Sequence, residues 1–76
     1  MKDLLYYIVR QIVDHPDAVS IQEVTRDDVL VLELSVDPSD MGKVIGRQGK
    51  IAKSIRSIIK AAAIRENLRV NVDILG

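Results

Sequence analysis

VIGRQGKIAKSI, residues 44–55, is the stretch that decides the fold: Gly46 and Gly49 enclose Arg47 and Gln48, and a basic segment follows. Reversing a chain within four residues requires backbone angles that glycine adopts at little steric cost. The N–H groups of such a loop, and of a helix beginning after it, carry partial positive charge that suits an anion. We therefore predict a tight loop between two helices, with its backbone open to a negatively charged ligand.

The part of the chain before this loop predicts a helix and a β-hairpin. Apolar residues recur at helical spacing over 3–14, and Pro16 is expected to end that helix. Residues 19–24 and 29–36 have the β-branched or alternating apolar side chains of strands, with a tight turn at 26–28 between them. So short a connection predicts an antiparallel pair.

The part around and after the loop predicts two helices and a closing strand. Asp37 is expected to cap a short helix over 38–45, with Asp40 near the second position of a capping box. After Gly49 the apolar residues keep a 3.6-residue period, which predicts the longest helix, and residues 68–75 alternate as a strand. The predicted apolar stripe of the long helix is Ile51, Ile55, Ile58, Ile59 and Ala62.

The resulting order is helix, strand, strand, helix, helix, strand, which indicates an α+β fold. A helical crossover joins the strands at 29–36 and 68–75, so these two can lie parallel in a mixed three-stranded sheet with three helices on one face. We expect a single domain over residues 1–76, because no linker or low-complexity segment interrupts the chain. A chain of this size buries only about 60% of its unfolded surface, so it forms a groove rather than a deep cavity.

Charge is distributed unevenly although the net charge is zero. Residues 1–40 carry three basic and nine acidic side chains, whereas residues 41–65 carry seven basic and no acidic ones. A lysine-rich helix surface can serve solubility alone, but 25 positions without a balancing acid favour a phosphate-bearing partner. The seven basic residues are Lys43, Arg47, Lys50, Lys53, Arg56, Lys60 and Arg65.

Composition argues against an enzyme. The chain has no cysteine, which excludes a thiolate nucleophile, a disulfide scaffold and a thiolate zinc site. The glycines at 42, 46 and 49 fit neither a Walker loop nor a dinucleotide fingerprint. His15 is expected to interact with the dipole of the first helix, and Asp27 and Asp28 to form a solvated turn. We expect no catalysis, no cofactor and no metal.

Location is predicted from what the chain lacks. No run approaches the roughly 18 apolar residues that a membrane span needs. The absence of cysteine suits a reducing compartment. We expect a cytoplasmic protein without membrane attachment.

VIGRQGKIAKSI resembles the VIGxxGxxIxxI signature of the KH domain, and the order of elements resembles the type II form of that fold. The resemblance covers essentially the whole chain and is greatest to small single-domain KH proteins of bacteria. It implies binding of single-stranded RNA, with the GxxG loop gripping about four nucleotides by their backbone and the bases in an adjacent apolar groove. It also implies a role in post-transcriptional regulation or as an RNA chaperone, with family links to cell shape.

The same resemblance assigns roles around the loop. It places Ile45 and Ile51 in the floor of the apolar groove. Packing in the hydrophobic core is an alternative role for both residues, and the two roles are compatible. Tyr6 and Tyr7 are the only aromatic residues, so the domain lacks an evident stacking platform and should bind modestly, with a logarithmic salt slope of about −2 for about three phosphate contacts. The assigned residues are Gly46, Arg47, Gln48 and Gly49 for the clamp, Lys43, Lys50 and Lys53 for the charged rim, and Val44, Ile45 and Ile51 for the groove floor.

A protein-interaction module is the competing prediction. On the long helix Ile64 falls about 220° from Ile51, among the lysines and away from the apolar stripe. Ala61 and Ala63 are small neighbours that leave room for another helix, so Ile64 and Ala61 are candidate dimer contacts. The resemblance also implies self-association, or pairing with a larger protein that carries a KH domain beside a second nucleic-acid-binding domain. RNA binding and dimerisation are compatible.

Overall fold

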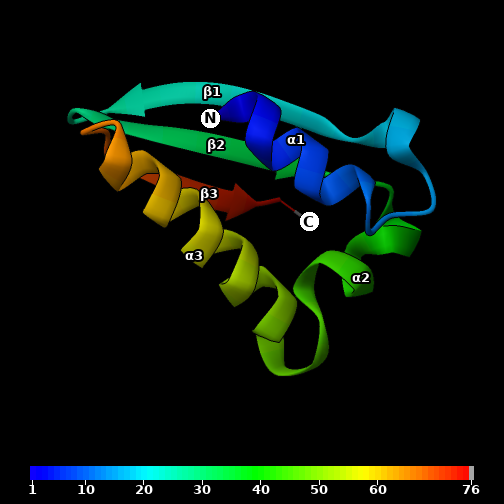
Figure 1. Ribbon diagram of the computed structural model, residues 1–76. Helices are drawn as coiled ribbons and strands as arrows, with labels where there is room; N and C mark the ends of the chain where they lie inside the picture. The colour runs from blue at the N-terminus through cyan, green and yellow to red at the C-terminus, as the bar shows by residue number, and fades with distance from the viewer. Residues whose placement is uncertain (76) are drawn as a thin grey trace.

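A computed structural model describes residues 1–75, which form one three-stranded sheet with helices packed on one face, in the predicted order (Figure 1). The strands are arranged β1-β2-β3, with β1 antiparallel to β2 and β2 parallel to β3. The mixed sheet and its parallel pair are therefore as predicted. The elements are α1 (Lys2–Arg10), β1 (Ser20–Arg26), β2 (Val29–Ser35), α2 (Met41–Ile45), α3 (Lys50–Arg65) and β3 (Val70–Ile74), with short 3₁₀ turns η1 (Pro16–Ala18), η2 (Pro38–Asp40) and η3 (Arg47–Gly49).

The first helix is shorter than predicted. α1 ends at Arg10 rather than at residue 14. The backbone N–H groups of Asp14 and His15 leave the helical pattern and donate to the carboxylate of Asp40, at 3.2 and 3.0 Å. A hydrogen-bond partner more than twenty residues away leaves no mark on helical periodicity, which explains the overestimate.

The hairpin turns through two aspartates. Asp27 and Asp28 have φ of 50° and 66°, and positive φ at both central residues is the signature of a type I′ turn, whose twist matches the flanking strands. Because Arg26 pairs with Val29 across this turn, β1 extends two residues beyond the predicted 19–24. Both aspartates are exposed, as a solvated turn requires.

A single apolar core joins the sheet to the helices. The three strands supply the sheet side of this core, and α1, α2 and α3 cover it from one face (Figure 1). Burying each Leu, Ile or Val side chain stabilises the fold by about 1.5–3 kcal/mol. The buried core residues are Leu5, Val9, Val13, Ile21, Leu32, Leu34, Val44, Ile55, Ile59, Ala63, Val70 and Val72.

The buried face of α3 is rotated relative to the predicted stripe. Ile51 and Ile58 belong to that stripe, yet 39% and 48% of their surfaces remain exposed. α3 packs on the core through two isoleucines and two alanines and leaves Ile51 and Ile58 at the margin. The buried residues of α3 are Ala52, Ile55, Ile59 and Ala63.

A Schellman motif ends α3 and delays the last strand. Asn67 lies at φ 57° and donates its N–H to the carbonyl of Ile64, while the N–H of Leu68 reaches the carbonyl of Ala63 at 2.9 Å. Leu68 is thus part of the helix cap, and β3 begins at Val70 rather than at 68. No helix within residues 1–75 combines the length and apolarity that crossing a membrane requires.

Candidate nucleic-acid interface

The loop from Gly46 to Gly49 lies where α2 meets α3 and projects beyond both helices (Figure 1). α2 closes with a 2.9 Å hydrogen bond from the Gly46 N–H to the carbonyl of Gly42. Gly46 and Gly49 then take φ of 74° and 73°. The predicted reversal between two helices is therefore present, and glycines occupy two of its three positive-φ positions.

The loop tip is strained and accessible. Gln48 has φ 57° and ψ 25°, a left-handed conformation that costs a side-chain-bearing residue about 1 kcal/mol. Arg47 and Gln48 are both exposed. Strain of this kind collects at functional sites because the surrounding structure maintains it.

Among the residues described, the start of α3 has no side-chain cap, although its first N–H group, that of Lys50, already donates to the carbonyl of Arg47. The hydroxyl of Ser54 donates instead to the carbonyl of Lys50, at 3.0 Å. The N–H groups of a first helical turn have no partner within the helix, and the helix dipole adds partial positive charge there. The end of the helix next to the loop can therefore bind a phosphate or another anion.

Within the described part of the chain, two of the three predicted rim cations form no ion pair, and neither does Arg47 of the predicted clamp, whereas the third rim cation is paired. Among residues 1–75 no ion pair involves Arg47, Lys50 or Lys53. Lys43, in contrast, donates to the carboxylate of Asp14 and lies 3.6 Å from Oδ1 of Asp40. The hydrogen bond to Asp14 raises the pKa of Lys43. Because two carboxylates already balance its charge, Lys43 is a weaker candidate for the rim than its spacing indicated.

The predicted floor residues separate into two kinds. Ile45 and Ile51 are each 39% exposed, on either side of the loop, so both can touch a ligand. Val44 is completely buried in the hydrophobic core. A side chain without accessible surface cannot contact a ligand in this conformation. Val44 instead packs in the core and holds α2 against it.

A buried carboxylate anchors the arm that carries the loop. Asp40, just before α2, accepts hydrogen bonds from the N–H groups of Asp14 and His15 and lies 3.1 Å from Nδ1 of His15. Burial alone raises the pKa of Asp40, but these partners lower it by more, so the pKa lies below its ordinary value of 3.8. A five-residue helix is too short to be stable alone, and this tether, with Val44 in the core, holds α2 in place.

Two expectations about this region are corrected. Asp40 does not complete a capping box, because its side chain bonds the segment after α1 and not the start of α2. Asp37 is a cap as predicted, but of the 3₁₀ turn η2 that precedes α2, where it accepts from the N–H of Ser39 at 2.9 Å. His15 does not interact with the end of a helix, because α1 ends at Arg10 and the imidazole turns to Asp40.

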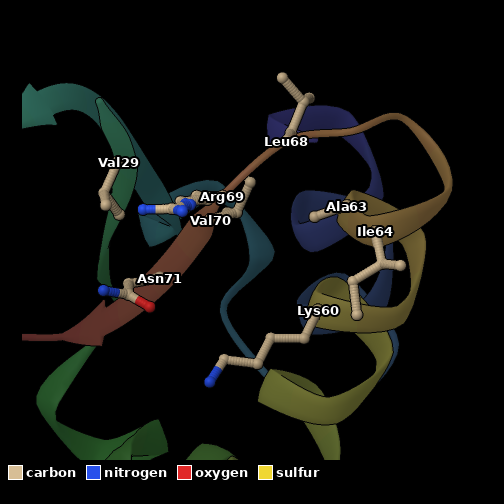
Figure 2. Close-up of a pocket in the computed structure, with 8 residues that line it drawn as sticks. All are labelled: Val29, Lys60, Ala63, Ile64, Leu68, Arg69, Val70 and Asn71. Atoms are coloured by element: carbon tan, nitrogen blue, oxygen red, sulfur yellow. The ribbon is translucent and has the colours of Figure 1, made fainter.

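Two adjoining hollows between α3 and β3, here called the α3–β3 groove, were not predicted. The hollow nearer to the loop has a volume of about 210 Å³. The hollow farther from the loop, at the other end of α3, has a volume of about 310 Å³. Figure 2 shows Lys60 extending from α3 at the farther hollow, with Arg69, Val70 and Asn71 coming from β3 and the residue before it. The nearer hollow is lined by Arg56, Lys60, Val70, Asn71, Val72 and Asp73, and the farther by Val29, Lys60, Ala63, Ile64, Leu68, Arg69, Val70 and Asn71.

The candidate dimer contacts lie on different surfaces. Ile64 is 73% exposed and borders the α3–β3 groove. Ala61 borders a separate hollow of about 590 Å³ together with Ile58 and Ala62. Ala63 is buried in the core and cannot admit a neighbouring helix. Within residues 1–75, His, Asp and Glu side chains form no group that can hold a metal ion.

Comparison with known proteins places this geometry in context. A family model described as the KH domain of KhpA and KhpB matches residues 2–74. The RNA-binding protein KhpA of Clostridium acetobutylicum is 57% identical over 75 residues, which covers 99% of this chain and 100% of that protein. Proteins of the same name from Clostridium perfringens and Halalkalibacterium halodurans are 52% and 49% identical, covering 99% of this chain and 100% and 99% of theirs.

Proposed function

The chain belongs to the KhpA/KhpB family of KH domains, and we propose that it is a non-catalytic protein that binds single-stranded RNA with its GxxG loop and α3–β3 groove. One observation carries the proposal: the uncapped start of α3 and the three unpaired cations Arg47, Lys50 and Lys53 all lie at the loop. Relatives that match the full chain are named RNA-binding proteins.

The phosphates are held at the loop. The backbone N–H groups between Gly46 and Gly49 and at the start of α3 donate to phosphate oxygens, and the nearby cations add full charges. Gly46 and Gly49 carry no side chain, so the RNA backbone can come close to the protein backbone.

The bases lie beside α3. Ile45 and Ile51 offer partly exposed apolar surface next to the loop, and farther along α3 Arg56 and Lys60 line the α3–β3 groove. Tyr6 and Tyr7 are on α1 and line neither hollow of this groove. Because no aromatic side chain stacks on a base here, each of the few bound nucleotides contributes little binding free energy, and the overall affinity is modest.

The test is a titration of a fluorescent single-stranded RNA at low and moderate salt with the wild type and with Arg47→Asp, Gln48→Asp. Aspartate tolerates the left-handed conformation of position 48, so the double variant should keep its circular dichroism spectrum. We expect the wild type to bind with a logarithmic salt slope of about −2 and the variant not to bind.

A matched control separates local from global charge. Lys2→Asp, Gln11→Asp changes the net charge by the same amount at exposed positions of α1 and of the turn after it, and should bind nearly as the wild type does. If both double variants lose binding equally, the loop is not the clamp. If the wild type does not bind at all, the proposed function is wrong.

The wider role follows from the family. We propose that residues 1–76 act as a single KH domain in post-transcriptional regulation or as an RNA chaperone, in the cytoplasm where its RNA is found. No cofactor is needed for either role, since binding alone performs it.

Association through α3 is a second function, favoured by the exposure of two adjacent apolar residues. Ile64 is 73% exposed and Leu68 45% exposed, and both border the farther hollow. The partner is a second copy of the chain or a larger KH-containing protein of the KhpB or Jag kind. Sedimentation velocity of the wild type, Ile64→Gln and Ile58→Gln tests this, because Ile58 borders the other hollow of α3. Dissociation in Ile64→Gln alone supports the proposal, and a monomeric wild type refutes self-association.

A further inference from the structure

β3 presents an open edge to the α3–β3 groove. It pairs only with β2 within residues 1–75, and Leu30 and Leu34 of β2 bond the carbonyl of Arg69 and the N–H of Leu75, at 2.9 and 2.8 Å. In a parallel pair the residues of one strand turn their N–H and C=O groups alternately toward and away from the partner. The odd-numbered residues of β3 therefore bond β2, and Val70 and Val72 turn their backbone groups outward.

One side chain already occupies this edge. Nε of Arg56, on α3, donates to the outward carbonyl of Val72 at 3.2 Å. This bond confirms the outward orientation of Val72 independently of the register. A guanidinium group has five N–H donors and no acceptor, so four donors of Arg56 remain. Arg56 forms no ion pair within the described residues.

The bond changes which hydrogen-bonding pattern the edge offers. An unoccupied Val72 presents a donor and an acceptor, which complements a base edge that bears an amino group beside a ring nitrogen. With its carbonyl bonded to Arg56, the same position presents the Val72 N–H and the guanidinium N–H groups, which are all donors. Guanine and uracil carry carbonyl oxygens, O6 and O4, where adenine and cytosine carry amino groups, N6 and N4.

We propose that Arg56 is a specificity-determining residue that makes the α3–β3 groove prefer the keto bases guanine and uracil over the amino bases adenine and cytosine. The proposal rests on the RNA-binding function proposed above and adds its base preference.

Other polar groups of the groove do not reverse this preference. Arg69, Asn71 and Asp73 also line the groove, but all three stay unchanged in every variant compared below, so a change in the affinity ratio reports the substituted residue. Lys60 lines both hollows, but its ammonium group is a rotatable point charge that attracts phosphate whatever the base. Arg56 is thus the side chain whose removal should alter selection.

The test compares two fluorescent RNA octamers, (GU)₄ and (AC)₄, which have the same length, charge and purine–pyrimidine alternation but bear only keto or only amino bases. Binding of each is measured by fluorescence anisotropy with the wild type, Arg56→Met and Lys60→Met. Both residues are exposed on α3, so neither change should unfold the protein, and circular dichroism checks this. Each variant loses one positive charge from the same groove, so the ratio of the two affinities isolates base selection.

We expect the wild type to prefer (GU)₄ by about tenfold, the effect of one good base contact. Arg56→Met should bring the ratio to one or below, because the carbonyl of Val72 becomes available to amino groups. Lys60→Met should weaken both octamers equally and keep the ratio. Arg56→Lys keeps the charge but not the fork of donors, and should retain affinity while losing most of the preference.

Each other outcome is decisive. Equal affinity of the wild type for both octamers, a preference for (AC)₄, or a preference that survives in Arg56→Met overturns the role of Arg56 and leaves RNA binding intact. A preference lost equally in Lys60→Met overturns it as well, since charge would then be the cause. Failure of the wild type to bind either octamer refutes the proposed function, and the specificity proposal with it.

Discussion

A Cβ atom on Gly46 would lie 2.9 Å from the backbone nitrogen of Ile51 and 2.8 Å from its Cβ. Cβ atoms in folded proteins essentially never come within 3.0 Å of such neighbouring atoms, so a side chain at this position would force α3 to move. Gly46 also has φ 74°, which side-chain-bearing residues rarely adopt. The first glycine of the loop is therefore required for the close approach of α2 and α3 as well as for the turn between them.

Three glycine-to-alanine variants should differ in stability for this reason. Gly46→Ala is expected to lower the free energy of unfolding by at least about 2 kcal/mol, because strain and a steric clash act together. Gly49→Ala meets open space at φ 73° and should cost about 1 kcal/mol. Gly42→Ala, inside α2 with neither constraint, should be neutral or stabilising. Urea denaturation followed by circular dichroism measures all three, and equal losses at 46 and 49 would contradict the clash.

Asp40 should make the fold sensitive to acid. Its pKa in the folded protein lies below 3.8, so near that pH the unfolded chain binds more protons than the folded one. The stabilisation is therefore fully present at neutral pH and is lost as the pH falls through about 4 and below. Asp40→Asn should lower the melting temperature at pH 7. It should also make the free energy of unfolding fall less steeply as the pH drops below about 4.

A second aspartate serves as the comparison. The hydrogen bonds with Ser39 lower the pKa of Asp37 too, but this cap is exposed at the surface and joins no distant segments. Asp37→Asn should lower the melting temperature less than Asp40→Asn does. Urea denaturation at several pH values between 7 and 3 measures the free energy of unfolding of the wild type and both variants. If stability falls with acid equally in the wild type and in Asp40→Asn, Asp40 is not the cause of the acid sensitivity.

Lys43 and Lys53 should differ in their effects on RNA binding. Lys53 has no carboxylate partner within residues 1–75, so Lys53→Ala should weaken binding and reduce the logarithmic salt slope by about 0.7, the value for one phosphate contact on a single strand. Lys43 is paired with Asp14 and Asp40, so Lys43→Ala should leave the slope unchanged and act on stability. Titrations at several salt concentrations compare the two. A slope that changes equally in both variants would mean that Lys43 exchanges its carboxylates for phosphate.

Asn67 should tolerate glycine but not a β-branched residue. It occupies the left-handed position of the α3 cap at φ 57°, where Asn67→Gly should be neutral within a few tenths of a kcal/mol and Asn67→Val should cost more than about 1 kcal/mol. Thermal unfolding measures both. Similar melting temperatures for the two variants would contradict the strain assigned to this position.

Local patterns predicted the order of elements, the mixed sheet and the position of the loop. The alternation in 29–36 and the 3.6-residue period after Gly49 identified a strand and a helix correctly, because β2 and α3 pack on the same core, although β2 also buries Val31 and α3 leaves Ile58 exposed. Glycine at positions 46 and 49 was informative for the same reason, since positive φ is a local property.

Relationships between distant segments were not predictable in this way. Asp40 bonds Asp14 and His15 across 26 and 25 positions, which shortens α1 and brings Lys43 to Asp14. Periodicity also does not say which apolar residues of a helix lie nearest the sheet, so the exposure of Ile58 was missed. The α3–β3 groove has one wall from each of two elements. The sequence identified Arg56 and Lys60 only as members of the basic stretch, and nothing in it places them beside Val72.

The parallel pairing of β2 with β3 also sets the order in which the site can assemble. The hairpin of β1 and β2 closes through a two-residue turn, but the pair Leu30 and Val70 joins residues forty positions apart, and contacts of such separation form late because a long segment must first be confined. The groove has no second wall until that step is complete. During refolding, the capacity to bind RNA should therefore appear after most of the helical signal has returned.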